Sequence, residues 1–230
     1  SAQGSAADYE RAGELRQRFS GLVTRDSLSP VWLPGGKLLY SVPTGRGMQE
    51  LILIDPRAPH DGQRTVLSEL PELASAWGGR KARLLGATAG EDGAVQMLDL
   101  DGRALRFDPV TRTVTELELD QADGFLLEPT RNTRGDRSGS RTTLLFVNRT
   151  ASPIELRWVS GDPGGRSYGE VAAGETREMS TFAGHLWRIE APESVREAAE
   201  DKELAPLHFR GGSQPGVVLL QGDSWSAVES

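Results

Sequence analysis

The residues best suited to recognising a ligand are concentrated between positions 142 and 189. This segment holds two of the five tryptophans, Trp158 and Trp187, with Tyr168 and one of the three histidines, His185. Aromatic rings offer flat apolar walls at a low entropic cost. We therefore predict a binding surface in this segment. Its short apolar runs, separated by turns about every eight to twelve residues, predict the strands of a small antiparallel sandwich.

Motifs for catalysis are missing from the sequence. A serine hydrolase needs Gly-x-Ser-x-Gly at an elbow between a strand and a helix. The nearest strings, 211–215 (Gly-Gly-Ser-Gln-Pro) and 222–226 (Gly-Asp-Ser-Trp-Ser), lack the closing glycine. We predict that the chain has no catalytic residues and is not an enzyme, while a longer parent protein with a serine peptidase domain stays open. A weaker third hypothesis is that the chain itself is a hydrolase.

The composition argues against several classes of partner. The formal net charge is −7 and no run rich in Lys or Arg occurs, so we expect neither nucleic acid nor an anionic membrane as a partner. The absence of Cys excludes disulfides and thiolate metal ligands. Because His60, His185 and His208 lie far apart, we expect no metal site and no cofactor. No apolar run approaches the length of about 18 residues that a membrane span needs.

The first residue is Ser1 rather than Met, and small residues precede the first regular pattern. Such a start fits the mature end left by signal cleavage, and it also fits a cloning boundary. We expect a secreted or periplasmic protein. A cytoplasmic location stays open, because a chain without Cys suits either compartment.

Regular patterns begin with an amphipathic helix predicted over residues 8–19. From Val31 the period changes to that of strands, with turn signals such as Pro34-Gly35-Gly36 and Asp101-Gly102 between them. These signals predict two four-stranded meanders, with strands at 31–33, 37–42, 49–55 and 64–67, and at 82–88, 94–100, 103–108 and 113–117.

The two meanders end alike. The first ends in Leu53-Ile54-Asp55-Pro56-Arg57 and the second in Arg106-Phe107-Asp108-Pro109-Val110. A repeat of roughly 40–50 residues with four strands per unit is typical of β-propeller blades. Because a closed propeller needs roughly four to eight blades, we interpret the two as part of a propeller.

The start of the chain strengthens this interpretation. Tyr9-Glu10-Arg11-Ala12 and Phe19-Ser20-Gly21-Leu22-Val23 are followed by Pro30-Val31-Trp32-Leu33. With these motifs, residues 8–120 resemble the N-terminal propeller of dipeptidyl peptidase IV and related prolyl oligopeptidase-family serine peptidases. The resemblance implies a non-catalytic propeller that gates access to a hydrolase domain.

A second resemblance covers residues 141–221. Its motifs are Phe146-Val147-Asn148-Arg149-Thr150, Trp158, and Thr181-Phe182-Ala183-Gly184-His185-Leu186-Trp187. They look like the β-domain of the von Hippel–Lindau tumour suppressor, which implies a β-sandwich with residues 193–201 as an added helical insertion. The family's helical domain has no counterpart in this sequence, so we expect no ubiquitin-ligase adaptor as a partner.

This second resemblance implies a site for a peptide that carries 4-hydroxyproline. Aromatic rings would enclose the pyrrolidine ring, while a His nitrogen and a Thr hydroxyl would bond its hydroxyl group. Such a site would discriminate against plain proline by roughly 1–3 kcal/mol or more, because buried polar groups would be left unpaired. The residues implied are Trp158, Tyr168, Thr181, His185 and Trp187, with the backbone of Ser180 beside the extended peptide.

Three positions depart from the family's pattern. Thr181 adds a methyl group where the family has Ser, Phe182 replaces Tyr, and Ala183 replaces Arg. A purely structural interpretation also stays open, because two tryptophans on strands suit the core of a sandwich. The sequon Asn148-Arg149-Thr150 is formally a glycosylation site, but we favour turn capping by its asparagine.

Together these patterns predict an all-β chain with an N-terminal helix, two blade-like meanders and a VHL-like β-sandwich. The predicted function is a non-catalytic module that binds a proline- or hydroxyproline-containing peptide. The alternative is the structural, substrate-gating front of a longer prolyl oligopeptidase-type serine peptidase. The predicted boundaries are 1–120 for the helix and partial propeller, 121–140 for a linker, 141–222 for the VHL-like β-domain and 223–230 for a tail.

Overall fold

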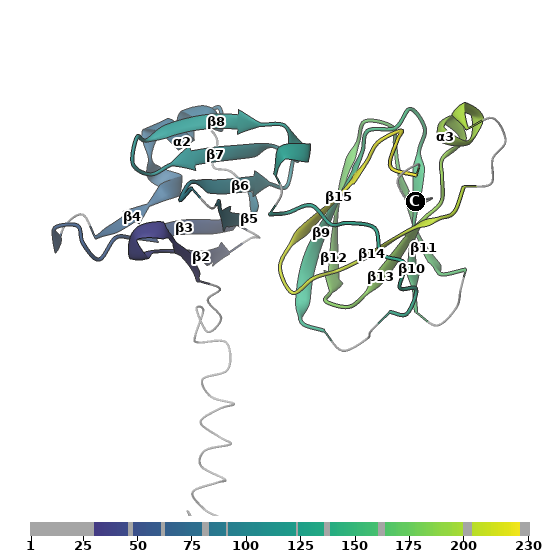
Figure 1. Cartoon of the computed structure of the whole chain (residues 1–230), viewed down its shortest axis with the longest axis horizontal. Helices are drawn as coiled ribbons and strands as arrows, with labels where there is room; N and C mark the ends of the chain where they lie inside the picture. Colours follow the sequence, from purple (N-terminus) through teal and green to yellow (C-terminus); the bar gives the residue numbers. More distant parts are fainter. Residues whose placement is uncertain are drawn as a thin grey trace, which may run out of the picture.

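The described residues form four β-sheets with few helices, which confirms the predicted all-β class. Figure 1 shows the two N-terminal sheets on one side of the molecule and the two C-terminal sheets on the other. The helix predicted over residues 8–19 lies outside the described part of the chain. The computed structural model describes residues 30–45, 48–60, 63–79, 83–90, 92–122, 124–135, 139–160, 164–199 and 204–225.

The first sheet is the predicted N-terminal meander. Its strands pair antiparallel in chain order, β1-β2-β3-β4. Gly35 takes a φ of 80° in the turn after β1, a left-handed conformation that glycine adopts without strain. A short helix, α2, follows where the sequence indicated only a connection. The bounds are β1 (Val31–Leu33), η1 (Pro34–Gly36), β2 (Lys37–Gly45), β3 (Met48–Ile54), β4 (Arg64–Val66), η3 (Leu67–Glu69) and α2 (Pro71–Ala76).

The second sheet is the second predicted meander, again antiparallel in chain order, β5-β6-β7-β8. The Asp101-Gly102 turn between β6 and β7 is held by Asp99, whose carboxylate accepts the backbone N–H groups of Asp101 at 3.0 Å and Arg103 at 2.8 Å. The strands are β5 (Leu84–Ala89), β6 (Val95–Asp99), β7 (Ala104–Asp108) and β8 (Thr113–Leu117), followed by η4 (Leu119–Gln121).

Turn formation explains why the two meanders share a sequence motif. The carboxylate of Asp55 accepts the N–H of Arg57 at 3.1 Å, and that of Asp108 accepts the N–H of Val110 at 2.8 Å. Such bonds favour the ionised carboxylate. The pKa of Asp55 is lowered, chiefly by a hydrogen bond from Lys37, and the pKa of Asp108 is lowered chiefly by the N–H of Val110. The repeated Asp-Pro is therefore a turn after a strand.

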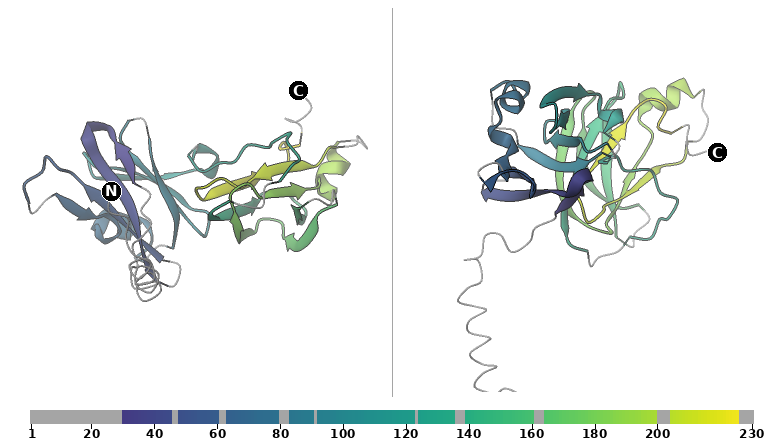
Figure 2. Two further views of the ribbon diagram at one scale, coloured as in Figure 1. Left: turned by 90° about the horizontal axis from the view of Figure 1, so that it is seen from below. Right: turned by 60° about the vertical axis from the view of Figure 1, so that its left-hand side comes forward.

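The two meanders are packed face to face. Apolar side chains of both sheets and of α2 form one buried cluster between them, in which Leu39, Leu51, Met97 and Leu105 are each 1% exposed. Figure 2 shows this stacking from two further directions. The two predicted meanders are therefore present as stacked four-stranded sheets, while their interpretation as propeller blades stays a prediction.

The C-terminal half is a two-layer sandwich. One sheet has the order β12-β9-β15 and the other β11-β10-β13-β14. A core that includes Phe146, Leu156, Trp187, Phe209 and Trp225 fills the space between them. The elements are β9 (Arg141–Asn148), β10 (Ile154–Val159), β11 (Arg166–Val171), β12 (Thr176–Phe182), β13 (Leu186–Ile189), α3 (Glu193–Ala198), β14 (Leu207–Arg210) and β15 (Gly216–Leu220). The helix α3 lies where the helical insertion was predicted.

The outer face of the β12-β9-β15 sheet is covered by the second meander. Leu145, Val147 and Val217 of the sandwich form a buried cluster with apolar residues of β5, β6 and β7. Residues near the predicted boundaries contribute to these cores. Phe125 is buried in this cluster, while Trp225 is buried in the sandwich core.

Within the described part of the chain, no helix is long and apolar enough to cross a membrane.

Candidate functional site

The strand β12 forms an edge of the sandwich. Among the described residues only β9 pairs with it, in an antiparallel register without a bulge. Beyond one end of this pairing, the N–H of Ala183 bonds the carbonyl oxygen of Ser140 at 2.8 Å. Beyond the other end, the N–H of Asn148 bonds the carbonyl oxygen of Glu175 at 3.0 Å. These two bonds fix which residues of β12 face β9.

Hydrogen-bonded pairs alternate along an antiparallel ladder. Because the pairs at positions 175 and 183 are hydrogen-bonded, the odd-numbered residues between them also bond to β9. The N–H and C=O groups of Glu178 and Ser180 therefore point to the open edge. An exposed row of such groups is a template for an extended peptide. Ser180 therefore lies on an open edge, and its predicted contact with a peptide backbone stays a prediction.

A tight turn places His185 against β12. The N–H of His185 bonds the carbonyl oxygen of Phe182 at 3.1 Å, and Gly184 has a φ of 84°. A four-residue turn with a positive φ at its third residue is a type II turn, which glycine favours at that position. The Gly-His pair therefore serves a geometric purpose, because the turn brings His185 back beside Thr181.

The hydroxyl group of Thr181 is the polar centre of the site. The indole Nε1–H of Trp187 donates a hydrogen bond to Thr181 Oγ1 at 3.2 Å, and Oγ1 lies 3.2 Å from His185 Nδ1. Oγ1 accepts from the indole, and it can also either donate its own hydrogen to Nδ1 or accept one from it, depending on the tautomer of the His185 ring. Thr181 and Trp187 are 3% and 2% exposed, so this bond fixes the floor of the site.

Aromatic rings form the walls around this centre. The ring of Trp158 lies 4.9 Å from the ring of His185 and 6.5 Å from that of Tyr168, edge-on in the second case. Tyr168 in turn meets Trp187 edge-on at 5.3 Å. Trp158, Tyr168 and His185 are all half-buried. The five predicted side chains are therefore brought together, and three of them stay accessible to a ligand.

The side chain of Ser180 lies apart from the five side chains that come together in the site. It pairs with Thr143 across the ladder, whereas Thr181 pairs with Thr142, so the side chains of Ser180 and Thr181 lie on opposite faces of the sheet. The side chain of Ser180 is exposed and points away from the aromatic rings. Its backbone is what could contact a peptide that also reaches the rings.

Two further side chains border the site. Phe182, noted in the sequence only as a departure from the family, is 41% exposed and lies 5.2 Å from the ring of His185. The guanidinium of Arg166 lies 5.7 Å above the ring of Tyr168. Arg166 was not predicted, although strand alternation places residues 166 and 168 on one face of β11. A cation over an aromatic wall makes this border positively charged.

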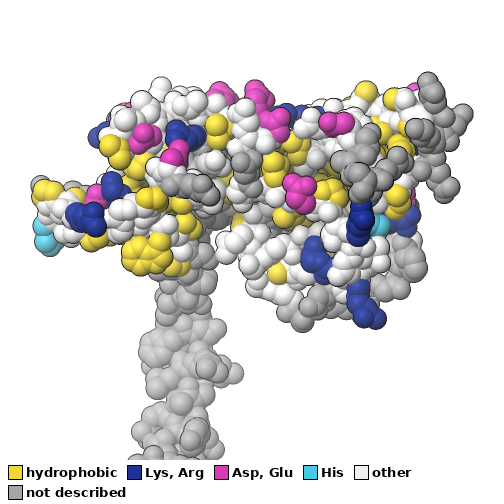
Figure 3. Space-filling view, viewed as in Figure 1, with side chains coloured by type: hydrophobic (Ala, Val, Ile, Leu, Met, Phe, Trp, Pro, Cys, Tyr) yellow, Lys and Arg dark blue, Asp and Glu magenta, His cyan; other side chains and the backbone are white. Residues whose placement is uncertain are grey.

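The surface charge is unevenly divided. Figure 3 shows Lys and Arg side chains gathered over the lower part of the sandwich, with Asp and Glu along the upper part.

Two titratable side chains of the sandwich have shifted pKa values. The pKa of Glu155 is lowered chiefly by a hydrogen bond with Ser167, so this carboxylate stays ionised, and its Oε2 lies 2.8 Å from Arg157 Nε. Burial lowers the pKa of His208 on β14, which favours a neutral ring there. The described residues contain no group of three or more side chains that could hold a metal ion.

Asn148 has the structural role that we favoured. Its side chain is completely buried, and its Nδ2 donates to the carbonyl oxygens of Ser152, Val171 and Ala172 at 2.9–3.1 Å. Its Oδ1 accepts the N–H of Thr150 at 3.0 Å and the hydroxyl of Thr150 at 2.7 Å. Turn capping is confirmed, and the glycosylation interpretation is wrong for the folded chain because the amide is inaccessible.

Comparison with known proteins identifies part of this region. Residues 133–205 match the family model of the VHL beta domain. This match supports the second resemblance and contains every residue of the candidate site. VHL beta domains are substrate-binding β-sandwiches without catalytic function, so a binding module is the class of protein that the match supports.

The N-terminal resemblance has no such support. No curated protein matches the chain. A solved structure that is similar to the chain is the extracellular domain of a putative hybrid two-component system from B. thetaiotaomicron, with 10% sequence identity and a TM-score of 0.25. The alignment covers 91% of this chain and 32% of that one, so the chain spans about a third of its length. Neither comparison supports a propeller of the dipeptidyl peptidase type.

Proposed function

We propose that the C-terminal sandwich binds an extended peptide along the open edge of β12 and encloses a 4-hydroxyproline of that peptide between Trp158, Tyr168 and His185. The observation that carries this proposal is the hydroxyl of Thr181, held between Trp187 and His185 directly beside an unpaired strand edge. The VHL beta domain match supports peptide recognition in general.

Each part of the site has a distinct task in this account. Glu178 and Ser180 offer backbone N–H and C=O groups to the peptide, which provides affinity without sequence preference. The aromatic walls exclude water around the pyrrolidine ring. His185 and Thr181 recognise the ligand hydroxyl, and they would lose a partner if proline took its place.

Calorimetry with two peptides tests the proposal. Both peptides are ten residues of Val and Thr with Asp at the ends, and they differ only in a central 4-hydroxyproline or proline. We expect the hydroxylated peptide to bind at least about fivefold more tightly, because one unpaired buried polar group costs about 1–3 kcal/mol. Equal affinities would remove hydroxyl recognition, and no binding of either peptide to the folded protein would remove the proposal.

Proline substitution tests the role of the strand edge. Proline is tolerated where the lost N–H faces away from a sheet. Ser180→Pro should therefore retain every bond between β12 and β9, and it should weaken binding of the hydroxylated peptide by about tenfold or more. The matched change Met179→Pro removes a ladder bond and should cost about 1–3 kcal/mol of stability, because it leaves a carbonyl oxygen of β9 without its partner. Thermal unfolding measures the stabilities, and calorimetry measures the affinities. Unchanged peptide binding by Ser180→Pro would place the peptide elsewhere.

A second candidate function is a structural one. The face-to-face packing of two meanders through a shared core favours a scaffold of propeller type. In that case the chain would be the substrate-gating part of a longer peptidase. The coding sequence beyond residue 230 tests this candidate, and a peptidase domain there is the expected result.

A further inference from the structure

A cavity outside the candidate peptide site lies where three of the four sheets meet. Its volume is about 530 Å³, which is within the range of roughly 300–1,000 Å³ typical of small-molecule sites. It is lined by β1 and β2 of the first meander, by β5 of the second, and by the segment before β15 in the sandwich. Junctions between domains are common places for ligand sites.

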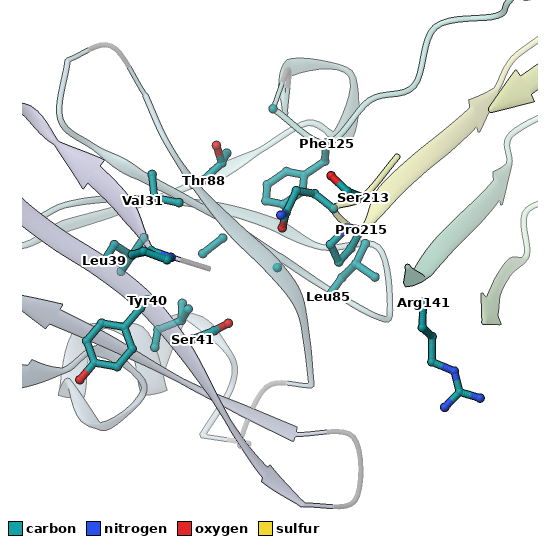
Figure 4. Close-up of a pocket in the computed structure, with 16 residues that line it drawn as sticks. Val31, Leu39, Tyr40, Ser41, Leu85, Thr88, Phe125, Arg141, Ser213 and Pro215 are labelled. Carbon is teal, nitrogen blue, oxygen red and sulfur yellow. The ribbon is translucent and has the colours of Figure 1, made fainter. Parts of the chain in front are cut away.

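The floor of the cavity is apolar. Leu39, Leu51, Leu85 and Phe125 all line it and are each no more than 5% exposed. Figure 4 shows Leu39 from the first meander, Leu85 from the second, and Phe125 from the connection to the sandwich. Gly86 keeps the floor open beside Phe125, because a Cβ atom at position 86 would lie only 3.2 Å from the Phe125 ring. These four side chains are almost fully covered, so the apolar surface that a ligand can reach comes from Val31, Ala87 and Pro215, which also line the cavity and are half-buried. A ligand needs an apolar part to match that surface.

The border of the cavity is polar and positively charged. Ser41, Thr88, Ser213 and Gln214 supply neutral polar groups, and Arg141 is the only charged residue in the lining. Figure 4 shows the side chain of Arg141 extending away from the apolar residues on the sandwich side. Among the described residues no carboxylate forms an ion pair with Arg141, although eight other such pairs are found.

We propose that this cavity binds an elongated organic monocarboxylate, with its apolar chain or ring against Val31, Ala87 and Pro215 and its carboxylate on Arg141. Partly exposed apolar side chains and, at one border, a guanidinium without an ion-pair partner among the described residues match the two parts of an amphipathic anion. Planar guanidinium groups also bind carboxylates through two parallel hydrogen bonds. This site is independent of the peptide site and needs no part of the proposed peptide recognition.

The probes for the test are 4-phenylbutyrate and 4-phenylbutan-1-ol, which share the apolar part and differ in charge. Ligand-observed NMR detects binding, and titration gives the affinities for the wild-type chain and three variants. Arg141→Gln removes the cation. Arg149→Gln is the matched control, because Arg149 is an exposed arginine just beyond the other end of β9. Ser213→Trp places a large side chain at the exposed mouth of the cavity.

We expect the acid to bind about five- to tenfold more tightly than the alcohol, as a partly desolvated ion pair allows. Arg141→Gln should remove this difference, Arg149→Gln should preserve it, and Ser213→Trp should abolish binding of both probes. The peptide affinity of Ser213→Trp should stay unchanged, which separates the two sites. Equal binding of the two probes to the wild type, no binding at millimolar concentration, or binding unaffected by Ser213→Trp would each overturn the proposal.

Discussion

Replacing Asn148 with alanine is expected to lower the free energy of unfolding by about 3 kcal/mol or more. The side chain is buried and forms five hydrogen bonds that join the end of β9 to the turn at residues 150–152 and to the end of β11. Alanine leaves these partners without their bonds, and each buried unsatisfied group costs about 1–3 kcal/mol. Urea denaturation of the variant, with an unchanged slope, measures the loss.

Asn148→Asp provides a sharper comparison at the same position. Aspartate has nearly the same shape, but it offers an oxygen to three carbonyl oxygens that now receive N–H groups. It also buries a charge without a partner. We expect Asn148→Asp to be less stable than Asn148→Ala at neutral pH. Equal stability of the wild type and both variants would show that this network does not hold the two sheets together.

Replacing Trp187 with alanine is expected to cost about 3–5 kcal/mol, the range for truncating a large buried aromatic side chain. Its ring is 2% exposed and meets Phe146 at 5.4 Å and Tyr168 at 5.3 Å, both edge-on. Since domains have stabilities of about 5–15 kcal/mol, this variant should be close to unfolded at moderate temperature. Thermal unfolding by circular dichroism gives the shift.

Trp187→Phe separates packing from hydrogen bonding. Phenylalanine retains an aromatic ring in the core but cannot donate to Thr181 Oγ1, so it releases the hydroxyl whose position defines the site. We expect a smaller loss of stability, about 1–3 kcal/mol, together with weaker binding of the hydroxylated peptide. A variant with wild-type peptide affinity would show that Trp187 has only a core function, which is the structural interpretation left open by the sequence.

The meanders could be predicted almost strand by strand because their pairing is local. Turn residues such as Asp101-Gly102 lie between strands that pair with each other, so neighbouring sequence contains the needed signals. The sandwich is different. Its central strand β9 pairs antiparallel with β12 and parallel with β15, which begins 68 residues after β9 ends. No local pattern indicates which distant strands pair, and that part of the prediction relied on a family resemblance.

The candidate site likewise could be predicted only where the sequence signal is local. Its five side chains were named from motifs, but their convergence depends on the Gly184 turn and on β12 being an edge strand. The position of Arg166 beside Tyr168 follows from alternation on β11, so it could be predicted from the sequence once that strand is located. The cavity at Arg141 could not be predicted, because its lining comes from segments as distant as residues 39 and 215.

The most direct test of peptide recognition is the amide NMR spectrum of the chain during titration with the hydroxyproline peptide. The amide proton of Ser180 should shift and become protected from exchange with solvent, since it gains a hydrogen bond at the open edge. The Nε1–H signal of Trp158 should shift as well, whereas the amide of Met179, already bonded to β9, should keep its protection. Shifts confined to residues outside β12 and the aromatic walls, or an unprotected Ser180 amide at saturation, would contradict the account.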